Sequence, residues 1–103
     1  MKKFEKLDFS GFEKHLVHGI ENSDSFGALR YIFRFENNYG ASVVRVPGIS
    51  YGYEQGLWEL AVIQWFKDEW HITYNTDITD DVLGYLTDSS VKVFLQKIKE
   101  LNV

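Results

Sequence analysis

The stretch from Leu57 to Phe66, LWELAVIQWF, is apolar at every position except Glu59 and Gln64. A strand with one face in water alternates apolar and polar side chains, whereas a strand covered on both faces is almost continuously apolar. The stretch therefore predicts a central β-strand with cover on both faces. The chain has 103 residues, the size of one domain, so residues 1–103 are expected to form a single unit around this strand.

Three further strands are predicted beside it. Residues 28–36 alternate with a period of two. One face holds Leu29, Tyr31, Phe33 and Phe35, and the other holds Arg30, Ile32 and Arg34. Residues 41–46 and 70–75 are the other two predicted strands. Because the connections are short, with a type II turn at Pro47-Gly48 and a polar loop at 67–69, neighbouring strands are expected to be antiparallel.

A helix is predicted at each end of the chain. Ser10 and Glu13 fit a capping box, and apolar side chains follow at helical spacing over residues 11–21. Thr79 fits the cap of a short helical turn, and Thr87 fits the cap of a longer helix. That helix has an apolar stripe formed by Val91, Phe94, Leu95, Ile98 and Leu101. The predicted fold is α+β: a four-stranded antiparallel meander sheet with an N-terminal and a C-terminal helix packed on one face.

Composition limits the classes of function. Hydrophobic residues make up 45% and aromatic residues 17% of the chain, which is typical of a folded domain. The formal net charge of −4 argues against nucleic acid as a partner. The N-terminus lacks the apolar segment of a signal peptide, and no apolar run approaches the roughly 20 residues of a membrane span. We therefore expect no contact with a membrane and a cytoplasmic location.

Acidic residues form the first candidate site. They are Asp77, Asp80, Asp81 and Asp88. A small metal-dependent enzyme that uses Asp77, Asp80 and Asp81 is one alternative function, since clustered carboxylates bind divalent cations. The spacing fits no calcium-binding loop, and aspartates that follow a helix cap also stabilise the helix N-terminus.

Other catalytic and metal-binding patterns are weaker still. The three histidines are His15, His18 and His71, and nothing in the sequence brings His71 near the other two. The chain has no cysteine and no G-x-S-x-G motif. We predict no catalytic residues, no cofactor and no metal. An enzyme is the less favoured interpretation of the sequence.

Arginines on the predicted sheet form the second candidate site. Arg30, Arg34 and Arg45 could share one face with aromatic side chains, which is how single-stranded nucleic acid is often held. A single-stranded nucleic-acid binder is thus another alternative. The opposing interpretation is that the arginines cover the open face of the sheet with their aliphatic stems.

The loop before the central strand is the favoured site. Tyr51, Tyr53 and Glu54 lie in the segment SYGYEQG, between the Pro47-Gly48 turn and Leu57. Tyrosine is enriched at protein interfaces, because it buries a large area at low entropic cost and keeps a polar tip. We predict that these three residues bind a partner. The alternative is that both tyrosines fold back over the sheet edge.

Three motifs carry a resemblance: NNYGASVVR, SYGYEQGLWELAV and TDITDDVLGYLT, followed by an amphipathic C-terminal segment. Together they resemble a group of small uncharacterised proteins of bacteriophages and prophages over roughly residues 31–101. The loop at 67–69 lacks the glycine that the group often has there. The resemblance implies no activity. It implies a phage accessory protein in the cytoplasm of a bacterial host.

The function that we expect is non-enzymatic binding of a host or phage protein. Small size, the missing catalytic constellation and the phage-like resemblance favour it. Inhibition of a host system is one specific form of such binding.

Overall fold

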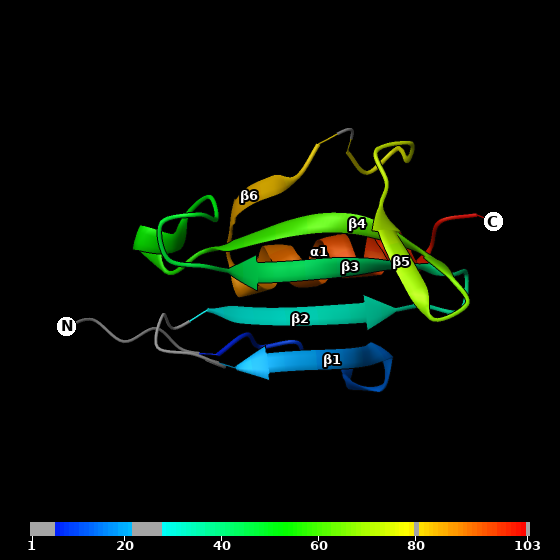
Figure 1. Cartoon of the computed structure of the whole chain (residues 1–103), viewed down its shortest axis with the longest axis horizontal. Helices are drawn as coiled ribbons and strands as arrows, with labels where there is room; N and C mark the ends of the chain where they lie inside the picture. The colour runs from blue at the N-terminus through cyan, green and yellow to red at the C-terminus, as the bar shows by residue number, and fades with distance from the viewer. Residues whose placement is uncertain (1–5, 22–27, 80, 103) are drawn as a thin grey trace.

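The structure is a computed structural model and describes residues 6–21, 28–79 and 81–102. Within these residues, the strands are β1 (Leu16–Glu21), β2 (Leu29–Arg34), β3 (Tyr39–Arg45), β4 (Trp58–Phe66), β5 (Glu69–Ile72) and β6 (Leu83–Leu86). One α-helix, α1 (Asp88–Lys99), follows them, and two short 3-10 turns lie at Glu13–His15 and Tyr53–Gln55. Figure 1 shows α1 lying across one face of the antiparallel sheet. The α+β class with an antiparallel sheet is confirmed.

The strand β4 is the centre of the sheet, as its apolar sequence predicted. The sheet order is β1-β2-β3-β4-β5, and β6 also pairs with β4. One edge of β4 pairs with β3. The other edge is shared, because β6 pairs near Trp58 and Leu60 while β5 pairs with residues 63–66. Every neighbour of β4 is antiparallel to it.

The main core lies between the sheet and α1. The apolar face predicted for residues 28–36 is confirmed, because its four side chains are all buried in this core together with Trp58, Leu60 and Val62 of β4. From the helix, Val91, Leu95 and Ile98 are fully buried against them. The apolar stripe predicted for the helix therefore faces the sheet.

The opposite face of β4 is also covered. Ile63 and Trp65 are buried there with Ile32, and Trp70 of β5 packs on the cluster. The Trp65 indole donates a hydrogen bond to the carbonyl of Phe33 at 3.1 Å. Cover on both faces of the central strand is thus confirmed.

The predicted N-terminal helix over residues 11–21 is wrong. Residues 16–21 form β1, which pairs with β2 and supplies the hydrogen bonds that this edge of β2 would otherwise lack. Gly11 has a φ of +96°, which is not a helical value. Gly19 lies within β1, and a glycine in a helix would cost about 1 kcal/mol relative to alanine. No capping box forms: the Ser10 amide donates to Asp8, and the Glu13 carboxylate accepts from Gly11.

The count of four strands is also corrected, because β6 forms where a helical turn was predicted. The hydroxyl of Thr79 accepts from the amide of Asp81 at 3.0 Å, which closes a turn and not a helix. After this turn the chain returns to β4, so Leu83 pairs with Leu60 and Leu86 pairs with Trp58. A strand that pairs with one end of another strand cannot be recognised from its own four residues.

Both ends of α1 are capped. The Thr87 hydroxyl accepts from the amide of Ser90 at 3.1 Å, so the predicted cap is confirmed. At the other end, the Asn37 amide donates to the carbonyls of Ile98 at 2.9 Å and Leu101 at 3.0 Å. The turn between β2 and β3 therefore also holds the helix C-terminus.

The indole of Trp58 joins the sheet to the start of α1. Its side chain is 0% exposed, and its Nε1 donates to the Asp88 carboxylate at 2.9 Å. The other Asp88 oxygen accepts from the amide of Asp8, also at 2.9 Å. Arg45 lies over the Trp58 ring at 4.3 Å from the ring centre. One carboxylate thus connects the central strand, the helix and the N-terminal segment.

We expect Trp58→Phe to lower the free energy of unfolding by about 1.5–3 kcal/mol, because it removes a hydrogen bond to a charged acceptor. Chemical denaturation measures the loss. In an Asp88→Ala background the same change should cost clearly less, since the bond is already absent. Equal costs in the two backgrounds would show that the indole and the carboxylate do not interact.

Candidate functional site

The loop that carries the predicted site is fixed by the backbone before it. Gly48 has a φ of +71°, and the Ile49 amide donates to Val46 at 3.1 Å, which fits the predicted type II turn. Ser50 is buried, and its hydroxyl accepts from the Val46 amide at 2.8 Å. The loop is therefore held at its start and is not a free excursion of the chain.

Two tyrosines from distant parts of the sequence form a pair at the start of this loop. Tyr51 is 57% exposed and Tyr85 of β6 is 60% exposed. Their rings are stacked, with centres 6.4 Å apart and planes inclined by 25°. The Tyr85 amide also donates to the Tyr51 carbonyl at 3.3 Å. We call Tyr51 and Tyr85 the tyrosine pair.

Glycines make the close approach of the two segments possible. A Cβ atom on Gly84 would lie 2.6 Å from the Cβ of Tyr51, a distance that no real side chain tolerates. A Cβ atom on Gly52 would lie 3.0 Å from the Cα of Tyr85. Each glycine therefore lies beneath the tyrosine of the other segment, in a reciprocal arrangement.

Tyr85 has a φ of +57°, in the left-handed region that aromatic residues rarely adopt. This conformation costs an L-residue roughly 1–2 kcal/mol. Such strain persists where the surrounding structure imposes it, and it is concentrated at functional sites. At Tyr85 the strained backbone leaves a large aromatic ring exposed to solvent.

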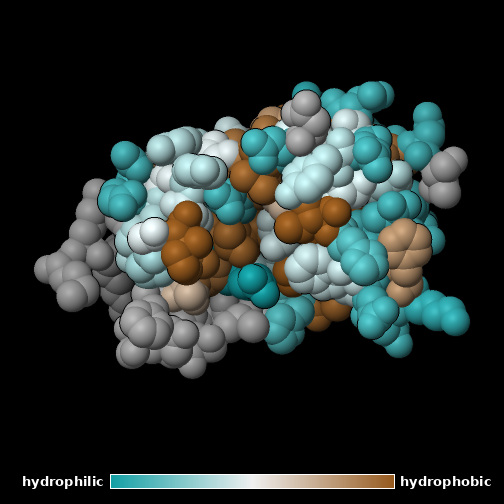
Figure 2. Space-filling model, turned by 45° about the horizontal axis from the view of Figure 1, so that its top comes forward, coloured by the Kyte–Doolittle hydropathy of each residue, from teal (hydrophilic) through white to brown (hydrophobic). Residues whose placement is uncertain are grey.

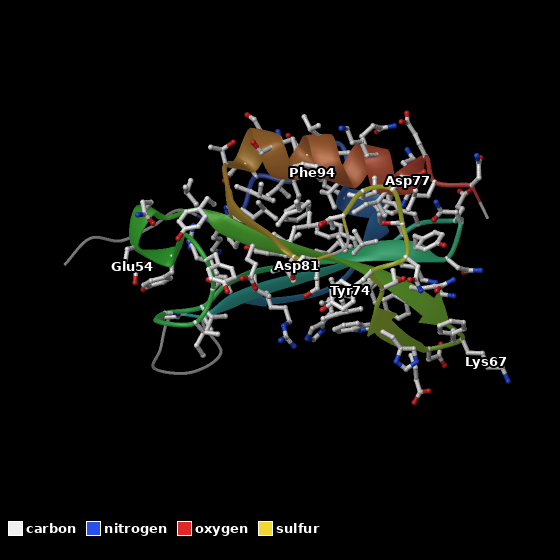
Figure 3. All side chains as sticks on the ribbon, turned by 90° about the horizontal axis from the view of Figure 1, so that it is seen from above. Glu54, Lys67, Tyr74, Asp77, Asp81 and Phe94 are labelled. Carbon is white, nitrogen blue, oxygen red and sulfur yellow. The ribbon has the colours of Figure 1, made fainter. Side chains whose placement is uncertain are left out.

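The predicted site residues are partly brought together. Tyr51 is in the tyrosine pair, Tyr53 is half-buried in the 3-10 turn, and Glu54 is exposed at the end of the molecule (Figure 3). Sequence reasoning missed Tyr85, which was assigned to a helical region. It also missed Ile49, which is 78% exposed. No sequence pattern singles out Tyr85, because the pairing of tyrosine with glycine in Tyr51-Gly52 and Gly84-Tyr85 also occurs in Tyr39-Gly40 of β3.

Glu59 explains one polar interruption of the central strand. It is half-buried, and its carboxylate accepts from the Tyr51 amide at 3.2 Å. A polar residue at the start of an apolar strand thus positions the loop that carries Tyr51. It also places a negative charge beside the tyrosine pair.

The acidic residues do not form a metal site in the part of the chain that the structure describes, where no group of three potential ligands comes together. Asp80 lies outside the described residues. Asp88 accepts from Trp58 and Asp8, and Asp81 accepts from the amide of Val82 at 2.7 Å. Figure 3 shows Asp77 and Asp81 at separate places along the loop before β6. Two of these carboxylates therefore have hydrogen-bonding roles in the fold.

The three arginines do not share a face. Arg45 is 4% exposed and lies in the main core, where its guanidinium donates to the carbonyl of Gly56 at 3.2 Å. Burial lowers the pKa of Arg45, while the negative charge of Asp88 acts in the opposite direction. Arg30 and Arg34 lie on the other face of β2, and Arg34 covers Trp65 at 4.9 Å. Arg34 also donates to the Lys67 carbonyl at 2.8 Å.

An open groove of about 430 Å³ lies at the other end of β3 from the Tyr51 loop. Its lining includes Lys14, His15, Arg34 and Asn38. The Arg34 guanidinium is engaged by Lys67 and Asn38. The Nε2 atom of His15 is buried without a hydrogen bond among the described residues. The groove is thus lined by an arginine that the fold already uses and by one buried ring nitrogen.

Burial lowers the pKa of His15, and the charges of Lys99 and Lys14 lower it further. A hydrogen bond with the backbone of Arg34 and the charge of Glu36 oppose this effect. Because the folded protein disfavours the protonated ring, the unfolded chain binds the proton first as the pH falls below 6.5, the ordinary pKa of histidine. The stabilising contribution is thus complete above this pH and is lost below it.

We expect the free energy of unfolding to fall between about pH 7 and about pH 5, and to fall less in His15→Gln. Denaturant titration at a series of pH values measures it. His18→Gln, a change at an exposed histidine of β1, is the matched control and should keep the wild-type pH dependence. If His15→Gln keeps the wild-type pH dependence as well, the buried ring is not the source of that dependence.

The glycine beneath Tyr51 gives a second prediction. Gly84→Ala should separate the two rings and destabilise the protein by about 1–3 kcal/mol, because the new Cβ overlaps the Tyr51 side chain. Denaturation and the ring-to-ring nuclear Overhauser effects between Tyr51 and Tyr85 report the two consequences. Gly19→Ala is the matched control, since neither glycine has a positive φ and a Cβ at Gly19 approaches no atom closer than 3.6 Å. Intact ring contacts in Gly84→Ala would contradict the reciprocal packing.

Comparisons with protein-family models, with curated proteins and with solved structures give no match. The resemblance to phage and prophage proteins therefore rests on its motifs alone. Among residues 6–21, 28–79 and 81–102, no helix has the length and apolar character that are needed to cross a bilayer.

Proposed function

We propose that this protein is a small, non-enzymatic protein-binding module whose contact surface is centred on the tyrosine pair. The observation that carries the proposal is the strained backbone of Tyr85, which holds an exposed ring against an exposed Tyr51. Rigid aromatic rings that are already ordered lose little entropy on binding, so they act as interface anchors.

We propose the tyrosine pair as the anchor of an interface and not as the whole of it. A standard interface buries about 800 Å² on each partner, which is about an eighth of the 6514 Å² surface described here. On the face shown in Figure 2, apolar groups form separate patches between hydrophilic ones, without one broad apolar area. A few central aromatic residues within a polar rim are the usual energetic pattern of such interfaces.

The context that we propose is a phage-type accessory protein in the cytoplasm of a bacterial host, with a host or phage protein as its partner. Inhibition of a host system is one form of this function. The metal-dependent enzyme stays an alternative prediction, as does the single-stranded nucleic-acid binder. Of the three arginines, a nucleic-acid binder would have only Arg30 and Arg34 to contact the strand, because Arg45 is in the core.

Tyr85→Gly separates binding from stability. We expect the free energy of unfolding to change by no more than about 1 kcal/mol, because glycine relieves the left-handed strain while the aromatic stacking is lost. The same change should weaken a partner complex by about 2 kcal/mol or more, as the loss of an interface anchor does. Denaturation measures the first quantity, and quantitative capture from a bacterial lysate measures the second.

Tyr74→Ala is the matched control for capture. Tyr74 is an exposed tyrosine that lies well away from Glu54 in Figure 3, and its removal should leave capture unchanged. If Tyr85→Gly captures the same proteins in the same amounts as the wild type, the tyrosine pair is not the binding surface. If Tyr85→Gly loses several kcal/mol of stability, the ring is a part of the fold.

A further inference from the structure

The charges of the chain are distributed unevenly along the sequence. Between Arg45 and Lys92 the only basic residue other than His71 is Lys67. The same stretch holds eight acidic residues: Glu54, Glu59, Asp68, Glu69, Asp77, Asp80, Asp81 and Asp88. Both segments that form the tyrosine pair belong to this stretch. The two segments that form the pair are therefore acidic in sequence, while the exposed Arg30 lies in one cross-strand row with Val44 and Glu59.

Carboxylates also lie near the pair in the structure. Glu59 is held by the amide of Tyr51 at 3.2 Å, and Glu54 is exposed in the turn that follows Gly52. Arg45, the base that precedes the loop, is turned into the core and lies over Trp58 at 4.3 Å. Its charge is thus withdrawn from the surface that the loop presents.

Building on the proposed function, we propose that the partner presents a cationic segment to this surface, with an arginine side chain over the tyrosine pair. A guanidinium is attracted to the face of a tyrosine ring and can donate hydrogen bonds to a carboxylate from the same position. The protein itself uses the ring contact twice, with Arg34 over Trp65 and Arg45 over Trp58. At the surface, Tyr51 and Tyr85 offer an incoming arginine their rings, and Glu59, which accepts from the Tyr51 amide, offers a carboxylate.

This assignment selects a partner by charge as well as by shape. Opposite charges across an interface speed association and disfavour wrong partners. A nucleic-acid backbone would bring phosphates toward Glu54 and Glu59, which repel them. A protein segment that is rich in arginine fits the surface, and single-stranded nucleic acid does not.

A blocked peptide of alternating glycine and arginine is the probe, and the same peptide with citrulline in place of arginine is the control. Citrulline keeps the shape of the side chain but carries no charge. In a titration followed by NMR at low salt, the arginine peptide should shift the ring signals of Tyr51 and Tyr85 saturably. The citrulline peptide should not. Binding of the arginine peptide by the full chain should weaken about three- to tenfold in the double variant Glu54→Gln/Glu59→Gln.

Glutamine at position 59 keeps an oxygen that can accept from the Tyr51 amide, so the double variant tests charge and not the position of the loop. Equal binding of the arginine and citrulline peptides would overturn the proposal. Unchanged affinity in the double variant would overturn it too, as would saturable binding of a single-stranded oligonucleotide at the same rings.

The two proposals fail in different ways. If Tyr85→Gly abolishes capture from a lysate but the arginine peptide has no advantage over citrulline, the binding surface stands and the cationic partner is overturned. If Tyr85→Gly leaves capture unchanged, the proposed function itself fails, whatever the peptide does.

Discussion

The hydrogen bond between the Trp58 indole and the Asp88 carboxylate is the contact on which the arrangement of this protein depends. Trp58 begins the central strand, and Asp88 begins the helix that covers the sheet. The same carboxylate accepts from Asp8, and Asp8 forms an ion pair with Lys92 at 3.0 Å. The hydrogen bond with Lys92, together with those with Ser10, lowers the pKa of Asp8 to about 2, so this carboxylate stays ionised well into the acid range.

This anchor also determines where the tyrosine pair lies. β6 ends directly before Thr87 and Asp88, and its last residue, Leu86, pairs with Trp58. The strand and the helix start are both fixed there, and Tyr85 has its positive φ at the point where it approaches Gly52. From the central strand, Glu59 fixes the amide of Tyr51. The two exposed rings are thus positioned by the same strand that forms the core, so the binding surface that we propose is ordered before a partner arrives.

Sequence reasoning recovered what depends on local patterns. The central strand, the buried face of β2, the turn at Pro47-Gly48 and the cap at Thr87 each follow from a few adjacent residues. It failed where contact with a distant segment of the chain determines the local secondary structure. Residues 16–21 have a helical pattern, but the open edge of β2 makes them a strand, and β6 forms only because β4 leaves half an edge free. For the same reason Tyr51 was predicted to be a site residue while its partner Tyr85 was missed.

The central claim is that the tyrosine pair is a rigid, preformed surface in the protein without its partner. Backbone NMR order parameters for residues 49–57 and 83–86 test this claim most directly. The account predicts values of about 0.85, equal to those of β4, together with persistent ring contacts between Tyr51 and Tyr85. Values below about 0.6 in these two segments, with no ring contacts, would contradict it, because the tyrosines would then be mobile side chains on a flexible loop.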